Sequence, residues 1–251
     1  MDIISKIVAS ISTLQAKDWV TLGASLSALI ISLLSYRQKS KEGRIALRNQ
    51  LTTLLEKLTD LNMNAELSKV KKDDYPPNYI NLLNDQRRFL VRQASFILTR
   101  ITDLVSPYEY LLIAGSFDEI NDPYQAEINF TSAIENATDA VDKGIAYRGF
   151  GRYLFHQGED MIDIARARFE RAISTFPELG DRNIIYRADT HERWAALELE
   201  YGHRKEALFQ FECTVAEYAR LSNPSRRTFH QNRLKSIASK YKSAIAGPKD
   251  G

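Results

Sequence analysis

Residues 146–177 read AYRGFGRYLFHQGEDMIDIARARFERAISTFP, and this stretch decides the fold. It holds two segments in which apolar residues recur at helical spacing, and Gly158 separates them. The second segment places Ala165, Phe169 and Ala172 on one helix face. The alanines there let a neighbouring helix come close, and the phenylalanine fills the gap between successive hairpins. The stretch therefore predicts a helix-turn-helix unit.

The same small-large-small triplet recurs on both sides of this unit, at a period of about 40 residues. Helical repeats of this length bury a continuous core only when several of them stack, with a cap at each end. We therefore expect a row of three helical hairpins over residues 108–221. The two further triplets are Ala126, Phe130 and Ala133, and Ala207, Phe211 and Thr214.

The middle unit resembles a tetratricopeptide repeat (TPR) in its residues Ala146-Tyr147, Phe150-Gly151 and Leu154, in Gly158 at the turn, and in Ala165, Phe169, Ala172 and the closing Pro177. It departs from the family pattern by about two extra residues before Ala165. The first unit starts its second helix at Asp122-Pro123, and the third has Thr214 in place of an alanine. The resemblance implies a TPR-like α-solenoid whose first helices form a concave face that binds a peptide or another protein.

The resemblance also implies which side chains face that groove: Arg148, Arg152, Phe155 and His156 of the middle unit, and Asp189 and Glu192 of the next. Two arginines one helical turn apart can hold a carboxylate by charge-assisted hydrogen bonds. They can equally pair with the acids of the neighbouring helix. The sequence leaves both interpretations open.

The stretch from Trp19 to Tyr36 contains no charged residue and has an aromatic residue at each end. As a helix it measures about 27 Å, close to the hydrocarbon thickness of a bilayer. Residues 18–36 are therefore expected to form a transmembrane helix, preceded by a short amphipathic segment at 1–17; a buried or interfacial helix and a cleaved signal peptide are the alternatives. Positive charges follow the stretch, which predicts a single-pass membrane protein with its bulk in the cytoplasm. They begin with Arg37, Lys39 and Lys41.

Residues 37–107 are expected to form a basic juxtamembrane stretch and then an antiparallel helical hairpin, because Pro76-Pro77 separates two periodic segments. The apolar seams serve either a core or an intermolecular coiled coil. Residues 222–251 are expected to form a basic capping helix and tail. The first seam is Leu47, Leu51, Leu54, Leu58, Leu61 and Ala65; the second is Ile80, Leu83, Leu90, Ala94, Ile97, Ile101 and Leu104, with Arg87 in register; the capping helix has Leu234, Ile237, Ala238, Tyr241 and Ile245.

Composition bounds the chemistry. The chain of 251 residues is 44% hydrophobic and 26% charged, as in a folded protein, and its single cysteine and four histidines predict no metal site. No catalytic motif is present, so neither an enzyme nor a cofactor is expected; the run from Asp189 to Glu192 is interpreted as a solvated helix start. With a net charge of +2 and few aromatics in the basic tail, nucleic acid is not an expected partner.

The sequence thus predicts an all-α, membrane-anchored adaptor or scaffold that recruits a protein partner. The alternative is a membrane effector or sensor subunit of a multi-component system that oligomerises through its N-terminal segment. In both cases lipid is a partner, and the formation of a homo-oligomer stays open.

Overall fold

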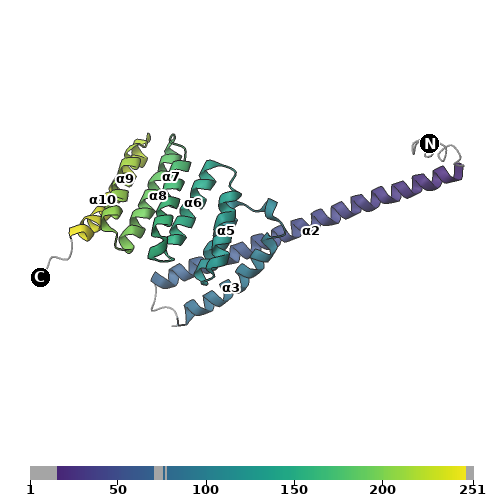
Figure 1. Ribbon diagram of the computed structural model, residues 1–251, viewed down its shortest axis with the longest axis horizontal. Helices are drawn as coiled ribbons and strands as arrows, with labels where there is room; N and C mark the ends of the chain where they lie inside the picture. The colour runs from purple at the N-terminus through teal and green to yellow at the C-terminus, as the bar shows by residue number, and fades with distance from the viewer. Residues whose placement is uncertain (1–15, 71–75, 77, 247–251) are drawn as a thin grey trace. The chain divides into compact units, whose positions relative to one another are not determined.

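The computed structural model describes residues 16–70, 76 and 78–246 (Figure 1). Over these residues the regular elements are all helices, and none is a strand. This confirms the all-α fold class. The chain divides into two compact units, Met1–Thr52 and Thr53–Gly251, which we describe separately.

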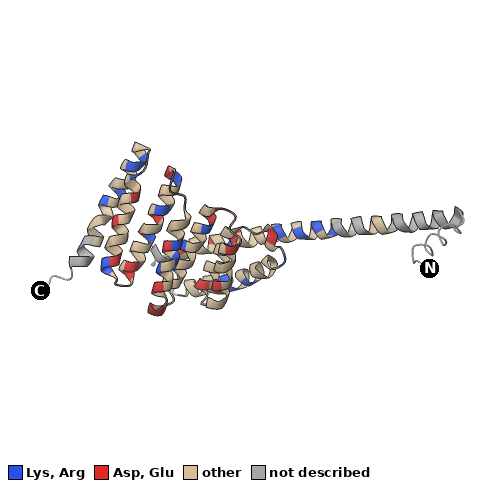
Figure 2. Cartoon of the chain, turned by 45° about the horizontal axis from the view of Figure 1, so that its top comes forward, with Lys and Arg blue, Asp and Glu red and all other residues tan. Residues whose placement is uncertain are grey.

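The first unit contains the beginning of α2 (Ala16–Val70), which runs without a break through the predicted membrane segment and the basic stretch after it. Lysines and arginines recur in the basic stretch that follows the predicted membrane segment (Figure 2). Among the described residues, no helix combines the length and the apolar character that a bilayer crossing requires. Residues 1–15, and most side chains between Trp19 and Tyr36, lie outside what the structure describes.

The second unit opens with the hairpin of α2 and α3 (Tyr79–Leu98). Leu61 and Ala65 of α2 pack with Leu83 of α3 in a small core of their own. The predicted α2 seam is buried in this unit at Leu54, Leu58, Leu61 and Ala65. These contacts place α2 against α3, as in a hairpin; residues 71–75 and 77, which join the two helices, lie outside the described residues.

The predicted α3 seam needs two corrections at its ends. Ile80 and Leu104 are exposed, because Ile80 lies in the first turn of α3 and Leu104 lies beyond its end, in a short 3₁₀ helix, η2 (Thr102–Leu104). In the centre, Val91 is fully buried and Arg87 is almost fully buried. The buried face of α3 therefore includes Arg87 and Val91 between Leu83 and Ala94, and it excludes Ile80.

Three helical hairpins follow, and each packs its second helix on its first. They are α4 (Pro107–Glu119) with α5 (Pro123–Glu135), α6 (Ala140–Phe155) with α7 (Ile162–Thr175), and α8 (Asp181–Glu200) with α9 (Arg204–Ala219). The helices from α5 onward stand side by side in sequence order (Figure 1). All nine triplet residues are buried, so the predicted packing is confirmed and the unit is solenoid-like.

Each hairpin turns at a residue with positive φ: Asn121 at 58°, Gly158 at 119° and Gly202 at 85°. Glycine adopts this region without strain, and asparagine tolerates it better than most residues. The extra residues after Gly158 form a short 3₁₀ helix, η3 (Glu159–Met161), before α7 begins. The insertion therefore lengthens one turn and leaves the packing of the triplet intact.

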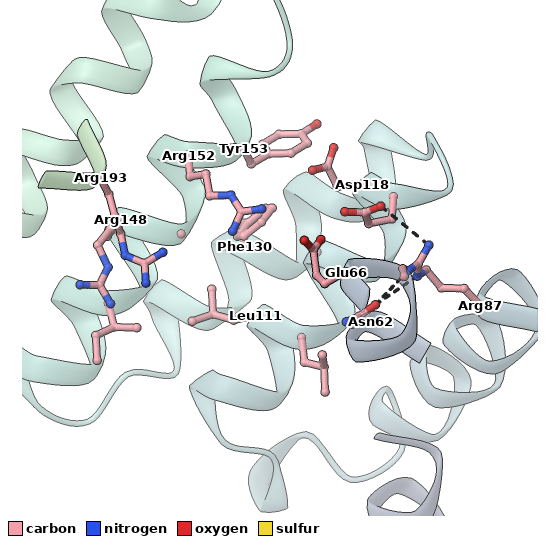
Figure 3. Close-up of a pocket in the computed structure, with 16 residues that line it drawn as sticks. Asn62, Glu66, Arg87, Leu111, Asp118, Phe130, Arg148, Arg152, Tyr153 and Arg193 are labelled. Atoms are coloured by element: carbon pink, nitrogen blue, oxygen red, sulfur yellow. Dashed lines mark hydrogen bonds and ion pairs between the residues drawn. The ribbon is translucent and has the colours of Figure 1, made fainter. Parts of the chain in front are cut away.

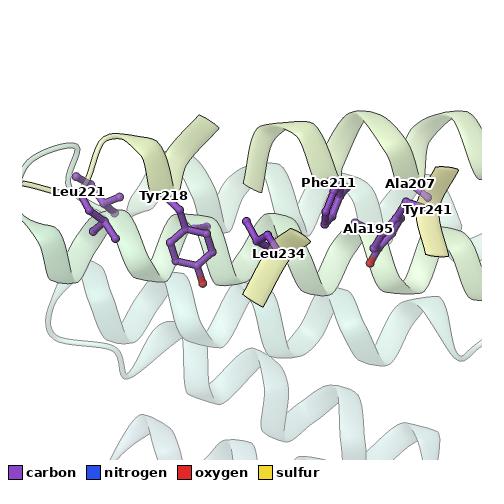
Figure 4. Packing of buried hydrophobic residues seen from close by; sticks show 9 residues of the cluster. Ala195, Ala207, Phe211, Tyr218, Leu221, Leu234 and Tyr241 are labelled. Carbon is purple, nitrogen blue, oxygen red and sulfur yellow. The ribbon is translucent and has the colours of Figure 1, made fainter. Parts of the chain in front are cut away.

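The last helix, α10 (Pro224–Ala246), packs on α9 and closes the end of the row. Its Leu234 and Tyr241 are buried in a cluster with residues of α8 and α9, including Ala195 (Figure 4). The Tyr241 ring stacks on the Phe211 ring with 4.4 Å between centroids. Over its described residues, α10 thus covers apolar side chains of α8 and α9.

Candidate functional site

The second unit contains a cavity of about 560 Å³. It lies along the first helices of the hairpins, α4, α6 and α8, and is completed by α2, α3 and one ring from α5. A cavity of this volume suits a few amino-acid side chains or a small molecule. Its lining residues are Asn62, Ala65, Glu66, Arg87, Leu111, Leu112, Gly115, Asp118, Glu119, Phe130, Ile145, Arg148, Gly149, Arg152, Tyr153 and Arg193.

Two glycines help to keep the cavity open. A Cβ atom added at Gly115 would meet no atom within 4 Å, and one at Gly149 would lie 3.2 Å from the side chain of Leu111. Glycine inside a helix destabilises it relative to alanine, so its presence at two positions facing one space is informative. These glycines are a signal that the sequence analysis did not use.

Three arginines form one side of the cavity: Arg148 and Arg152 from α6 and Arg193 from α8 (Figure 3). We call them the arginine triad. The Arg148 guanidinium donates a 3.5 Å hydrogen bond to the Thr190 hydroxyl. Burial, and next the positive charge of Arg193, lower the pKa of Arg148. Across the described residues, no carboxylate lies within ion-pair distance of any triad member.

The opposite side of the cavity carries acidic groups around a buried arginine (Figure 3). Arg87 lies 3.8 Å from Glu119 and donates to the Asn62 side-chain oxygen at 3.1 and 3.2 Å. Asp118 and Glu66 also line this side, and burial raises the pKa of Asp118. The cavity is therefore bipolar, with guanidinium groups toward α8 and carboxylates toward the α2–α3 hairpin.

The six side chains predicted to share a groove do not all meet here. Arg148 and Arg152 line the cavity. Phe155 is fully buried in the core, where its ring contacts the rings of Phe169 and Tyr201. His156 caps the end of α6, so it lies at the turn of the hairpin and outside the cavity.

Asp189 and Glu192 also lie elsewhere, at the interface of α8, α9 and α10. The Tyr218 hydroxyl donates a hydrogen bond to Asp189, and Arg233 forms a two-pronged ion pair with Glu192, with one bond of 2.6 Å. Asp189 and Glu192 therefore bind residues of α9 and α10. They do not form the ion pairs with Arg148 and Arg152 that the sequence left open. The third member of the arginine triad, Arg193, was not predicted from the sequence, although it directly follows Glu192 on α8.

The run from Asp189 to Glu192 is not a helix start, because α8 begins eight residues earlier, at Asp181. Thr190 is fully buried, and His191 contacts Gln210 of α9 at 2.6 Å. Successive residues of this run thus contact different neighbours, as helical geometry requires. Within the described part of the chain, no group of histidine, cysteine and acidic side chains is arranged to hold a metal ion.

Comparison with family models, with curated proteins and with solved structures found no match to the chain. The TPR resemblance therefore stays a prediction from the sequence. What stands is a solenoid-like row of helical hairpins, with a bipolar cavity along the first helices.

Proposed function

We propose that this protein is a membrane-anchored adaptor that binds a partner protein through an acidic segment seated in the cavity. The observation that carries the proposal is the arginine triad. Three guanidinium groups border one cavity, Arg148 is partly buried, and within the described chain no carboxylate forms an ion pair with any of them. The charges of Asp189 and Asp118 act on Arg148 and Arg152 from beyond ion-pair distance. Arg152 and Arg193 are exposed, so water screens part of their repulsion from Arg148, but three like charges around one cavity still favour an anion between them.

An acidic peptide supplies that anion in a suitable form. Arginine binds carboxylates with two parallel hydrogen bonds, which adds direction to the charge attraction. The carboxylates on the opposite side of the cavity favour a basic residue at the other end of the same segment, and disfavour a run of acids long enough to reach them. The proposed ligand is therefore a short segment with an acidic residue at one end and a basic residue at the other.

Binding can be measured by fluorescence anisotropy with short labelled peptides that carry an acidic residue at one end and a lysine at the other. The matched control peptides carry glutamine in place of the acid. Arg152→Gln and Arg193→Gln should each weaken binding of the acidic peptide by about tenfold or more, since one charged hydrogen bond contributes about 1.5–3 kcal/mol. Arg171→Gln, an exposed arginine on α7 outside the cavity, should leave the affinity unchanged.

Equal binding of the acidic and the glutamine peptides would refute the proposal. Both triad variants keep a long polar side chain, so thermal unfolding is expected to stay close to that of the parent protein. A loss of affinity with unchanged unfolding then reports on the cavity alone.

The membrane part of the proposal is supported by the uncharged run from Trp19 to Tyr36 and the positive charges that follow it. The full chain should sediment with membranes and stay there after an alkaline wash, whereas a chain beginning at Gly43 should stay in the supernatant. Protease added to sealed vesicles reports which side the hairpins occupy. A full chain that the alkaline wash releases would contradict the anchor.

A further inference from the structure

The outward face of α3 carries a ridge of large apolar side chains. Leu82, Phe89 and Phe96 are 54%, 63% and 59% exposed. They follow one another at intervals of seven residues, so they form a single stripe about 21 Å long. We call these three residues the α3 ridge. The ridge is distinct from the buried seam of the same helix, and contiguous apolar surface of this kind marks an interaction site.

The surface around the ridge is hollowed on both sides of Phe89. One hollow, of about 320 Å³, lies toward α2 and is lined by residues such as Leu61 and Leu90. The other, of about 490 Å³, lies between Phe89 and Phe96. A ridge next to hollows that accept an aromatic ring is self-complementary, which is the requirement for a two-fold contact between identical surfaces.

The charges beside the ridge decide how two copies would pair. Asp85 and Arg92 are separated by seven residues and flank Phe89 on the same helix face, and both border the second hollow. In an antiparallel pair whose two-fold axis passes beside Arg88 and Phe89, Asp85 of each copy lies opposite Arg92 of the other. A parallel pair would place like charges against each other.

We propose that the protein forms a homodimer in which the α3 ridges of two copies pack antiparallel. Phe89 of each copy lies near the two-fold axis and enters a hollow of the other copy. Arg88 contacts Asp85 within one chain at 3.1 Å, which neutralises the basic group nearest the axis. The hollows beside the ridge are bordered by charges of both signs, Asp60 and Asp85 with Lys57, Arg88 and Arg92. Such a mixed surface fits the opposite charges of a second copy better than an anionic lipid surface, which selects for basic residues alone. The inference is independent of the proposed peptide site, because the two share no ridge residue.

The first test is the oligomeric state of the full chain in a mild non-ionic detergent, measured by sedimentation over a range of concentrations. Phe89→Ser with Phe96→Ser should raise the dissociation constant of the dimer at least about tenfold. Both rings are mostly exposed in one chain, so folding should not suffer. Phe209→Ser with Phe229→Ser, which removes two exposed rings outside α3, is the matched control and should leave the dimer intact.

Charge exchange tests the antiparallel arrangement. Asp85→Arg and Arg92→Asp should each weaken the dimer, because each places like charges together across the axis. The double variant should recover most of the affinity, since it restores two opposite-charge pairs with their positions exchanged. A double variant no better than the single ones would contradict the arrangement.

Disulfide cross-linking tests the geometry in a Cys213→Ser background. Phe89→Cys should link two copies readily, whereas Leu82→Cys should not, because residue 82 lies far from its own copy in an antiparallel pair. Strong linking at residue 82 would indicate a parallel dimer and would overturn the proposal. A chain that stays monomeric at all concentrations would also overturn the dimer proposal. So would ridge variants that bind vesicles less well but self-associate as strongly as the parent protein.

Discussion

Replacing Phe169 with alanine tests the packing between the second and third hairpins. The ring is fully buried, stacks on the Trp194 ring at 5.6 Å between centroids, and meets the edge of Phe155 at 5.9 Å. Buried phenylalanine-to-alanine changes cost about 3–5 kcal/mol, and aromatic pairs add about 0.5–1.5 kcal/mol beyond burial. We therefore expect a loss near the upper end of the first range.

The assay is urea unfolding of the full chain, followed by far-UV circular dichroism and by tryptophan fluorescence in a Trp19→Phe background. Trp194 is then the remaining tryptophan, and its emission should change when the ring beside it is removed. Phe209→Ala is the matched control, because Phe209 is 54% exposed and should cost less than about 1 kcal/mol. If Phe169→Ala costs no more than Phe209→Ala, the inter-hairpin packing described above is wrong.

Three further predictions concern single contacts. Arg166→Met should lower the free energy of unfolding in urea by about 3–5 kcal/mol, because the fully buried Glu198 loses a two-pronged ion pair with bonds of 2.7 and 2.8 Å. Adding Glu198→Gln should restore a large part of this free energy, because it removes the buried charge. Gly115→Ala should raise the free energy of unfolding by about 0.5–1 kcal/mol, and with it the melting temperature, since the added methyl meets no atom within 4 Å. Gly151→Ala should lower the free energy of unfolding by about 1–3 kcal/mol, because its methyl would lie 2.9 Å from the Phe169 ring and 3.1 Å from a backbone oxygen. Burial, and next a neighbouring arginine, lower the pKa of His230, and burial lowers the pKa of His191, so the neutral forms of both favour the folded state. The free energy of unfolding should therefore fall as pH drops from about 6.5, the ordinary histidine pKa, toward the lower folded values. His230→Phe should reduce this dependence in unfolding curves measured across that range, and the contribution of His191 should remain.

Local pattern was enough to find the hairpins. The triplet of Ala165, Phe169 and Ala172 predicts a buried helix face because side-chain direction along a helix depends on spacing alone. Turn residues are also local in origin, since Gly158 and Gly202 adopt positive φ where the hairpins reverse. These features need no knowledge of which helix packs on which.

The site was only half predictable. Arg148 and Arg152 share a helix, so their common face follows from spacing, and both line the cavity. Arg193 joins them from a different hairpin, and Arg87 faces the same space from α3. Such convergence depends on how the hairpins stack, which the order of residues along one helix does not reveal.

The sequence by itself determined the all-α class, the three hairpins and the capping helix, because helical periodicity and turn residues act over a few neighbours. Only the tertiary structure decided that Phe155 belongs to the core and that Glu192 pairs with Arg233. It also decided that the arginine triad is left facing a cavity. Partner choice among buried and charged side chains is set by the rotation of each helix against its neighbours, and that rotation is a property of the assembled row.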